Sequence, residues 1–482
     1  MITTDILIIG AGAVGTALAR ELSKYKVKVV VCDRNDDVGG DASKSCSGLT
    51  STSATMPVGT LECKIRTISH TMVDTLCRDL DIPIIHCGSI APVLTDDQME
   101  QVPKLIDRAW QNGVWDYEFL PREDILAMEP ALNPEIRGGI YSPRDSQINQ
   151  FLMVVAEAEN AAENGVEFLL DCEVTGIETG GGRVRRVLTT KGEIAATWVV
   201  NAAGLHCDDI AKMVGECDFT VHPRKGEFYV LGHDTPVKVK HIISSVPTPK
   251  TRGVLVIPTT DDNLLVGPTA DDVEDKDDRK TTREGLEEVR TKALDMVPGL
   301  CFGDTITQFV GARPARVPEG YNILVSEKAK GYVGISGIRS TGLTASMALA
   351  KYVVHEMQGA GLALERKVGW VRTRRGIVKF AGRTDAEKDA LIAQNPLYGK
   401  IVCRCEQITE AEIVQAIRRP VGAKTLDAVK RRVRAGMGRC QSGFCGPQVT
   451  AILSRELGIP ETEVRKRGVA AYMLACDDAG RE

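Results

Sequence analysis

The sequence has little that would direct the chain to nucleic acid or into a membrane. Its formal net charge is only −5 over 482 residues, which gives no general attraction to a polyanion. No apolar run reaches the roughly 18 to 20 residues that a membrane-spanning helix needs. The first residues, Met1 to Asp5, lead directly into an apolar stretch without a secretory leader. We therefore expect small molecules and proteins as partners, with no nucleic acid and no transmembrane segment.

Cysteine patterns typical of secreted disulfide frameworks are also missing. All but four of the 14 cysteines are scattered singly, so we expect a reducing, cytoplasmic environment. Histidine is scarce, and none of the 7 stands out as a catalytic base. His86, His222 and His233 lie where they could face a cofactor, but a lone histidine is more often a satisfied core or surface residue. The length exceeds one ordinary core, so two or three domains are expected.

The remaining four cysteines lie near the C-terminus and predict a metal centre. Cys403 and Cys405 are followed, after 34 intervening residues, by Cys440 and Cys445. Four thiolates in two close pairs suit a [2Fe–2S] cluster, because each iron needs two protein sulfurs. A structural zinc is the alternative, although zinc sites usually show CxxC spacings. A cluster carries one electron at a time, so the rest of the chain should contain an electron donor.

The N-terminal region has the pattern of a βαβ unit that binds a dinucleotide. An apolar run, three glycines in the spacing GxGxxG, a helical stretch and a second apolar run ending in an acid follow one another. The glycines permit a tight turn and close approach of a pyrophosphate, and the acid binds the adenosine ribose. The predicted cofactor contacts are Gly10, Gly12, Ala13, Val14, Gly15, Asp33 and Arg34.

The segments that follow favour FAD over NAD. Small residues dominate the loop 38–48, as in loops that lie beneath a flavin ring, although an ordinary polar loop is the alternative. A strand before a glycine hairpin would meet adenine, and the end of another buried strand would lie near the cofactor. A glycine-rich turn then opens a helix whose positive end would stabilise a reduced flavin. These segments add Ser43, Lys44, Ser47, Val174, Ala203, Gly204, Gly337, Gly342, Leu343 and Thr344 as predicted contacts.

The overall pattern predicts an α/β protein: a Rossmann-type FAD-binding domain with an inserted β-rich substrate domain, plus a small helical [2Fe–2S] domain. The expected ranges are 1–82, 149–215 and 319–360 for the FAD-binding domain, 83–148 and 216–318 for the substrate domain, 361–395 for a basic linker, and 396–482 for the [2Fe–2S] domain and C-terminal tail. Residues 62–82 are expected to form one amphipathic helix. The acidic run 271–278 is expected to be a solvated loop.

Taken in order, these motifs resemble the D-amino-acid-oxidase-type flavoprotein superfamily over nearly all of 1–360. Besides the glycine fingerprint, the resemblance rests on Ser43-Lys44, Gly226-Glu227, Gly267-Pro268-Thr269, Arg313 and residues 340–344. The chain is most similar to the bacterial glycerol-3-phosphate and L-2-hydroxyglutarate dehydrogenases, whose longer members carry the same cysteine module. That module resembles bacterioferritin-associated ferredoxin. The resemblance implies FAD and a [2Fe–2S] cluster as cofactors and a small anionic hydroxy compound as substrate, oxidised by hydride transfer to flavin N5.

Some positions depart from the glycerol-phosphate members of this group. Residues 47–53 read Ser-Gly-Leu-Thr-Ser-Thr-Ser, without the histidine that those members place there. Residues 144–150 lack an expected small-residue stretch, and Arg339 stands in place of an expected glutamate. The two segments face substrate in the family, so these departures argue against glycerol 3-phosphate itself.

Two arginines and a serine are the candidate catalytic residues. The guanidinium forks of Arg313 and Arg339 match carboxylate or phosphate, with a structural ion pair as the alternative for each. Ser51 is a candidate hydrogen-bonding partner of the substrate. Lys225 and Tyr229 are weaker candidates, since one face of their strand could line the cavity.

The expected activity is a dehydrogenase that passes electrons through the cluster to a partner protein subunit or a quinone, within a hetero- or homo-oligomer. Two alternatives remain. One is an amine or imino-acid dehydrogenase subunit of the opine or proline type. The other is a non-catalytic electron-transfer subunit of a larger complex.

Overall fold

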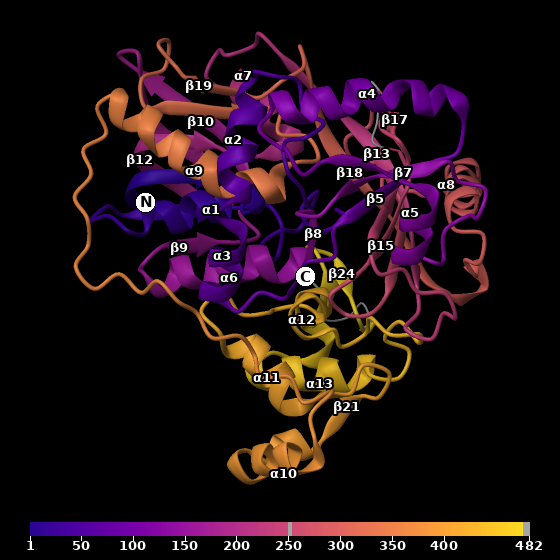
Figure 1. Ribbon diagram of the computed structural model, residues 1–482. Coiled ribbons are helices and arrows are strands. Elements are labelled where there is room, and N and C mark those ends of the chain that lie inside the picture. The colour runs from indigo at the N-terminus through magenta and orange to yellow at the C-terminus, as the bar shows by residue number, and fades with distance from the viewer. Residues whose placement is uncertain (249–252, 476–482) are drawn as a thin grey trace.

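The computed structural model describes residues 1–248 and 253–475. Figure 1 shows a sheet with helices on one side of the molecule, a second sheet on the other side, and a small module from the end of the chain beneath both. No helix in the two described ranges is both long and apolar enough to cross a membrane. The arrangement confirms the α/β fold class with an added small, mainly helical module.

The first sheet has a parallel centre. Strand β1 (Ile2–Ile9) lies between β2 (Val29–Cys32) and β12 (Gly192–Asn201), and all three run parallel. Strands β9 (Glu167–Leu169) and β20 (Tyr332–Ser336) continue the parallel order beyond them. The apolar run predicted as the first strand is buried in the centre, as expected for a parallel sheet covered on both faces.

An antiparallel part extends this sheet. Strands β10 (Val174–Gly180) and β11 (Arg183–Thr189) form the predicted hairpin, which pairs with the first half of β12. Strand β19 (Asn322–Val325) pairs with β20. The carboxyl ends of β1, β2 and β12 therefore meet at one edge, where the glycine loop follows β1.

Helices cover one face of the first sheet. Helix α1 (Ala13–Leu22) contacts both α6 (Gln150–Glu163) and α9 (Gly342–Gly359), and their apolar side chains share one core. The short α7 (Cys207–Lys212) contributes to a second core on the opposite face. The buried core thus holds α1, whose N-terminus begins at the glycine loop, against the sheet.

The stretch expected to form one helix at 62–82 is two helices. Helix α2 (Leu61–His70) packs against α9, and α3 (Val73–Leu80) packs against α6. Ile65 and Leu76 nevertheless belong to the same core. The prediction of a single helix was wrong because apolar spacing reports which side chains are buried, whereas the change of direction depends on which helix each half packs against.

The second sheet is assembled from two separated stretches of the chain. The first stretch supplies β5 (Ser89–Val93), β6 (Glu118–Pro121) and β7 (Gly138–Ser142). The second supplies β13 (Thr220–Leu231), β14 (Ile242–Ser244), β15 (Leu255–Pro258), β16 (Leu264–Gly267), β17 (Asp271–Asp272) and β18 (Thr305–Val317). Strand β14 joins the two sets by pairing in parallel with β5. Helices α4 (Asp96–Gln111), α5 (Arg122–Met128) and α8 (Arg283–Met296) pack on its strands.

A small sheet connects the two large ones. Strand β8 (Ser146–Ile148) lies between β3 (Leu49–Thr50) and β4 (Ile84–Ile85). Its pairing brings together the two segments in which the sequence departs from the glycerol-phosphate pattern. The remaining short helices of the described chain are η1 (Gly204–His206), η2 (Phe302–Asp304), η3 (Pro396–Gly399) and η4 (Glu461–Glu463).

The acidic run at 271–278 is mainly exposed loop, as expected, but part of it pairs with β13. Its first two residues form β17, which pairs with β13. Asp272 binds Arg224 through two hydrogen bonds, and Asp278 accepts one from the nearly buried Lys225 at 2.9 Å. These carboxylates pair with cations of β13, a strand about 50 residues earlier in the chain. A run of acidic residues does not by itself reveal such partners.

The C-terminal module has its own apolar core. It contains α11 (Glu410–Arg418), α12 (Leu426–Val433), α13 (Gly446–Leu457) and the two small hairpins β21–β22 (Ile401–Cys403, Ile408–Thr409) and β23–β24 (Arg465–Arg467, Ala471–Tyr472). Helix α10 (Asp385–Gln394) precedes it and lies at the far end of the molecule (Figure 1).

The segment 361–384 joins α9 to the module without further helix or extended sheet. Figure 1 shows it running along the outside of the first sheet and its helices. It is attached there, because the buried Arg374 donates hydrogen bonds to Glu159 and to the backbone oxygen of Leu80. Trp370 donates its ring N–H to Ser23. The basic residues of this segment therefore dock the connection onto the domain of the first sheet.

A buried ion triad docks the module onto the first sheet's domain. Asp37, just beyond β2, accepts two hydrogen bonds from Arg432, at 2.7 and 2.8 Å, and one from Arg431 at 2.7 Å. The side chains of Asp37 and Arg432 are each 1% exposed. Burial opposes ionisation of Asp37, but the two guanidinium groups outweigh it and hold its pKa below the ordinary value. Both arginines lie on α12, so the triad fixes this helix.

Replacing Asp37 by asparagine should strongly destabilise the docked state. The change leaves two buried guanidinium groups facing a neutral amide, and breaking such a buried pair costs about 3 to 5 kcal/mol. Urea unfolding of the holoprotein, followed by visible absorbance and circular dichroism, measures the loss. Because the pKa of Asp37 is lowered on folding, its contribution is present above the unfolded carboxyl pKa of about 3.9 and disappears as the pH falls through the lower folded value.

The matched control is Asp96→Asn, which removes the acid of an exposed ion pair with Arg137. Solvent screens such a pair, so little change in stability is expected. Equal effects of the two substitutions would contradict a special role for the buried triad.

Candidate functional site

The glycine loop after β1 has the shape that a pyrophosphate requires. Gly10 has φ +105°, and a Cβ there would lie 2.5 Å from the carbonyl oxygen of Ala202. A Cβ at Gly15 would lie 1.9 Å from the carbonyl oxygen of Gly10, so the third glycine lets α1 approach the loop. Gly12 precedes α1 and brings no side chain of its own to cap the helix, whose positive end favours an anion. These residues fit the dinucleotide that the fingerprint predicts.

Asp33 lies at the end of β2, beside this loop. One carboxylate oxygen accepts a hydrogen bond from Ala11 N–H at 2.7 Å, and the other accepts two from Asn35. Burial raises the pKa of Asp33 despite these donors. The hydrogen bonds orient the acid at the carboxyl edge of the sheet, where a ribose hydroxyl would approach.

The loop 38–48 has two chemically different sides. Ser43 accepts a hydrogen bond from Ala13 N–H at 3.0 Å, which places its hydroxyl against the start of α1. The side chain of Lys44 instead lines a separate cavity against the C-terminal module, as does Arg34. Ser47 is partly exposed. The structure thus brings Ser43 to the dinucleotide loop and turns Lys44 to the other side.

Other predicted cofactor contacts lie on the expected elements. Val174 begins β10 and is nearly buried, while Ala203 and Gly204 follow the end of β12. Gly337 has φ +79°, and a Cβ there would lie 1.9 Å from the carbonyl oxygen of Gly320, so the turn needs glycine. Gly342, Leu343 and Thr344 form the first turn of α9, whose N-terminus has no side-chain cap. That helix end is open in the way expected for stabilising a reduced flavin.

Arg339 lies in the turn between β20 and α9 and is held by a carboxylate. It adopts φ +49° and donates a 2.9 Å hydrogen bond to Glu62 of α2. Thr341 donates to the same carboxylate at 3.1 Å and is hydrogen-bonded to Tyr321. Burial, with Glu62 nearby, raises the pKa of Tyr321. Arg339 is therefore ion-paired with Glu62, and its second terminal nitrogen is 3.7 Å from the exposed Glu319. Its role toward a substrate stays a prediction.

Arg313 is a strand residue of β18 and is mainly engaged with backbone. Its Nε donates to the carbonyl of Arg224, and one terminal nitrogen donates to the carbonyls of Lys225 and Thr269, at 2.8 and 2.6 Å. Burial lowers its pKa to about 10. These bonds fix the guanidinium across β13 and the turn after β16. The remaining terminal nitrogen is the atom through which Arg313 would bind a substrate anion, and this role stays a prediction.

Ser51 lies in the region where the first domain meets the capping sheet. Its hydroxyl accepts a 2.6 Å hydrogen bond from Arg66, which also donates to the backbone oxygens of Ser51 and Thr52. A small cavity of about 40 Å³ is lined on one side by Ser51 and Thr52 and on the other by residues of β5, β7 and β14. The predicted serine is therefore positioned at an interdomain cavity.

The two unusual sequence segments meet at this cavity. Asp145 accepts hydrogen bonds from Thr52 N–H at 3.1 Å and from the hydroxyl of Ser89 at 2.8 Å. Strand pairing of β3 with β8 holds the same segments together. Asp145, Arg66 and Glu62 were not among the predicted site residues. Arg66 and Glu62 lie within the amphipathic stretch that we interpreted as core, so only their tertiary partners reveal them.

The histidines and the weaker candidates have other partners. His86 contacts Ser146, and His222 lies 3.3 Å from Asp272. His233 contacts Glu406 of the C-terminal module. Lys225 binds Asp278, and Tyr229 packs edge-on against Phe302. These contacts give each side chain a structural partner and single out none as a catalytic base.

The four C-terminal cysteines come together as two close pairs, each joining a cysteine of the first sequence pair to one of the second. Cys405 Sγ lies 3.7 Å from Cys440 Sγ. The thiol of Cys445 hydrogen-bonds that of Cys403 and thereby lowers the pKa of Cys403 to about 6. No group of three or more His, Cys, Asp or Glu side chains in the described chain is close enough for a single metal ion. Two thiolates for each of two irons is the requirement of a [2Fe–2S] cluster, and these residues fit it.

The loops around the cysteines are tightly packed. Gln441 and Ser442 both adopt positive φ between the last two cysteines, and α13 begins directly after Cys445. A Cβ at Gly438 would lie 2.4 Å from the Cβ of Cys405. Cys403 and Cys445 are buried, whereas Cys405 is exposed and Phe444 beside the centre is 83% exposed. The centre thus has a buried side and a side open to a partner.

A protein with these three parts is a flavin-dependent oxidoreductase that carries its own iron–sulfur domain. Comparison with known families supports both halves. Residues 5–356 match the family described as FAD dependent oxidoreductase, and residues 401–455 match the BFD-like [2Fe-2S] binding domain. The chain therefore belongs to the FAD dependent oxidoreductase family. FAD and a [2Fe–2S] cluster are confirmed as its cofactors, and the zinc alternative is wrong.

Several known proteins are similar to the chain. The glycerol 3-phosphate dehydrogenase of Caloramator mitchellensis is 40% identical over 98% of both chains. One subunit of the anaerobic glycerol-3-phosphate dehydrogenase of Escherichia coli K12 is 25% identical, over 94% of this chain and 88% of that one. The FAD-bound structure of L-alpha-glycerophosphate oxidase from Mycoplasma pneumoniae has a TM-score of 0.73 and 28% identity, covering 77% of this chain and 98% of that one.

Gly438→Ala should prevent assembly of the cluster while FAD binding is retained. The new Cβ would collide with the backbone-proximal Cβ of Cys405, which cannot move away without displacing the thiol. Iron and labile sulfide, measured on the purified protein, should fall well below the wild-type content. Gly399→Ala is the control in the same module, since its Cβ would make only an ordinary 3.6 Å contact with Ile392. Full iron content in Gly438→Ala would contradict the expectation.

Glu62→Gln should loosen the turn that begins α9. The substitution weakens charge-assisted bonds to Arg339 and Thr341, which are worth about 1.5 to 3 kcal/mol when made to a charged group. We expect lower resistance to urea and faster loss of FAD from the diluted holoprotein. Glu319→Gln removes the other, 65% exposed acid near Arg339 and should change little. If both variants behaved alike, the buried carboxylate would not be the one that orders the turn.

Proposed function

We propose that this protein is an FAD-dependent dehydrogenase that oxidises glycerol 3-phosphate or a closely related small anionic hydroxy compound. The observation that carries the proposal is the 40% identity to a glycerol 3-phosphate dehydrogenase over 98% of both chains. The match includes the FAD-binding part, the capping sheet and the cysteine module. Similarity limited to the flavin-binding fold would be compatible with many other substrates, because one fold supports many reactions.

The proposed reaction converts a secondary alcohol into a ketone. Oxidation removes a hydride and a proton from the substrate, and FAD, when bound, supplies the hydride acceptor at N5. The chain itself must hold the anionic end of the substrate and exclude water. The proposed cations are Arg339, which is partly exposed just before α9, and Arg313, through its remaining terminal nitrogen. Ser51 is proposed to hydrogen-bond the substrate at the interdomain cavity.

Electrons are proposed to leave through the cluster. The FAD-bound glycerophosphate oxidase corresponds to only 77% of this chain, whereas the dehydrogenase relative extends over the module as well. A [2Fe–2S] cluster passes single electrons, which suits a protein subunit or a quinone as acceptor. Cys405 and Phe444 form an exposed edge at which such a partner could approach. We propose a cytoplasmic protein that works in a larger assembly.

A 2-hydroxy acid is the second candidate substrate. The absence of histidine from 47–53 and the presence of Arg339 change the region that contacts substrate in the glycerol-phosphate members. An added guanidinium fork favours a planar carboxylate as well as a phosphate. The two candidates share an anionic group and a secondary alcohol and differ in the shape of the anion.

Glycerol 3-phosphate should bleach the flavin of the purified holoprotein under anaerobic conditions. Stopped-flow absorbance would follow FAD and the cluster together after mixing with glycerol 3-phosphate, L-2-hydroxyglutarate, L-proline or glycerol. We expect fast flavin reduction by the first compound, followed by reduction of the cluster, and no reduction by uncharged glycerol.

Reduction by L-2-hydroxyglutarate alone would favour the second candidate, and reduction by L-proline alone would favour the imino-acid alternative. A preparation with full FAD and iron that is reduced by none of them would contradict the proposed activity.

A further inference from the structure

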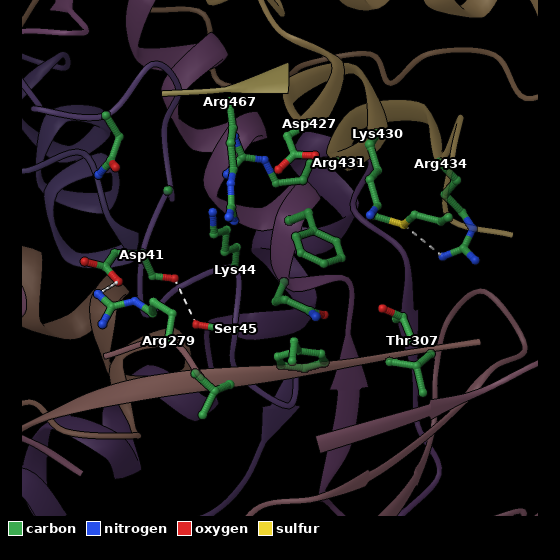
Figure 2. Close-up of a pocket in the computed structure, with 18 of the residues that line it drawn as sticks. Asp41, Lys44, Ser45, Arg279, Thr307, Asp427, Lys430, Arg431, Arg434 and Arg467 are labelled. Carbon is green, nitrogen blue, oxygen red and sulfur yellow. Dashed lines mark hydrogen bonds and ion pairs between the residues drawn. The ribbon is translucent and has the colours of Figure 1, made fainter. Parts of the chain in front are cut away.

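A large cavity lies where the three parts of the molecule meet. It has a volume of about 770 Å³. The loop 38–48 forms one wall, α12 and the β23–β24 hairpin form a second, and strands of the capping sheet form the third (Figure 2). A cavity of this size is within the range of small-molecule sites.

Three cations gather where the loop 38–48 faces the module. Figure 2 shows the side chains of Lys44, Arg431 and Arg467 pointing toward one another from three different elements, with Lys430 further along α12. The charges of Arg431 and Arg467 act on Lys44, and that of Arg431 acts on Lys430. Asp427 supplies one negative charge among them. The cluster therefore keeps an excess of positive charge in a confined space.

The other arginines around the cavity are paired. Arg279 binds Asp41 at 2.8 Å. Arg434 binds Glu406 at 2.7 Å and lies 3.2 Å from Asp261. These pairs are structural, which separates them from the cations of the central cluster.

The central cations have unused hydrogen-bond donors. The side chain of Arg431 is only 8% exposed and donates one terminal nitrogen to Asp37. Its Nε and other terminal nitrogen have no partner in the part of the chain that the structure describes. Burial and the neighbouring cations together lower the pKa of Lys44 and of Lys430. Leaving such donors unsatisfied is costly, and an anion in the cavity would accept from them.

The opposite wall carries apolar side chains among polar ones. Phe151, at the start of α6, and Phe309, of β18, line it together with Leu265 and Val310. Phe309 is stacked on Phe228 with ring centroids 4.9 Å apart, so its ring is held in place. The cavity thus offers cations at one side and fixed apolar surface at the other.

The cavity is separate from the dinucleotide groove. None of the glycine-loop residues Gly10, Gly12 and Ala13 lines it. Ser43 bonds to the start of α1, while Lys44, the next residue, enters the cavity. The loop 38–48 therefore divides two sites that lie on its two sides.

We propose that this interdomain cavity binds a phosphorylated small molecule, with the phosphate at Lys44, Arg431 and Arg467 and the rest of the molecule against the phenylalanine wall. Guanidinium and ammonium groups are the usual protein partners of phosphate. Because the cations come from the FAD-binding side and from the module, the ligand would bridge the two. It would also stabilise the docked module by mass action.

Calorimetric titration of the FAD- and iron-loaded holoprotein at constant ionic strength tests this site. The probes are inorganic phosphate, ribose 5-phosphate and AMP. We expect saturable binding with one site per chain, and tighter binding of AMP than of phosphate because AMP also reaches the phenylalanine wall. FAD should stay bound throughout, as followed by its absorbance after gel filtration.

Arg467→Gln should weaken AMP binding about tenfold, equivalent to ~1.4 kcal/mol. Lys466→Met is the matched control, because Lys466 is an exposed neighbour on β23 that does not line the cavity. The control should bind AMP like the unmodified protein. Iron and FAD contents confirm that each variant is folded.

Three outcomes would overturn the proposal. They are no saturable binding of any probe, release of FAD as a probe binds, and equal weakening by Arg467→Gln and Lys466→Met. The last result would mean general charge attraction instead of a built site. The titration involves no turnover, so its failure leaves the proposed dehydrogenase activity untouched, and failure of that activity leaves the site untouched.

Discussion

The buried contact of Asp37 with Arg431 and Arg432 determines how the two redox parts of this protein are placed. Asp37 follows the second strand of the FAD-binding sheet, and both arginines lie on one helix of the iron–sulfur module. Buried charges tolerate little separation, because each is costly when alone. The module is therefore docked in one position instead of hanging from its linker. The ordered segment 361–384, with Arg374 buried against Glu159, strengthens the same arrangement.

Further contacts tie the module to the capping sheet. Glu406, next to a cluster cysteine, is bonded to His233 of the cap and to Arg434 of α12. Arg434 also bonds Asn263 of the cap. The module thus contacts both sides of the region in which flavin and substrate are expected. Its docking creates the interdomain cavity, since neither wall alone would enclose it, and leaves the outer edge of the cysteine centre exposed for a partner.

The local motifs were predictable, but the partners of single charged residues were not. The glycine fingerprint, the hairpin after Val174 and the helix start at Gly342 follow from short spacings and from glycine's tolerance of positive φ. Arg313 was predicted to bind an anion, and the sequence did not reveal that its Nε and one terminal nitrogen donate to backbone carbonyls of β13. The acidic run was expected to be a solvated loop and is mainly exposed, but the pairing of Asp272 with Arg224 was not predicted. In each case the partner is contributed by a strand distant in sequence.

The amino-acid sequence by itself determined the chemistry: a dinucleotide loop, four thiols for an iron–sulfur cluster, and the order of the parts along the chain. These features depend on residues a few positions apart, so backbone geometry and ligand spacing define them. Only the tertiary structure decided that α2 and α3 are separate helices, that Glu62 holds Arg339, and that Lys44 meets α12 across a cavity. Those outcomes arise from packing and burial of charge between distant segments, which no local pattern encodes.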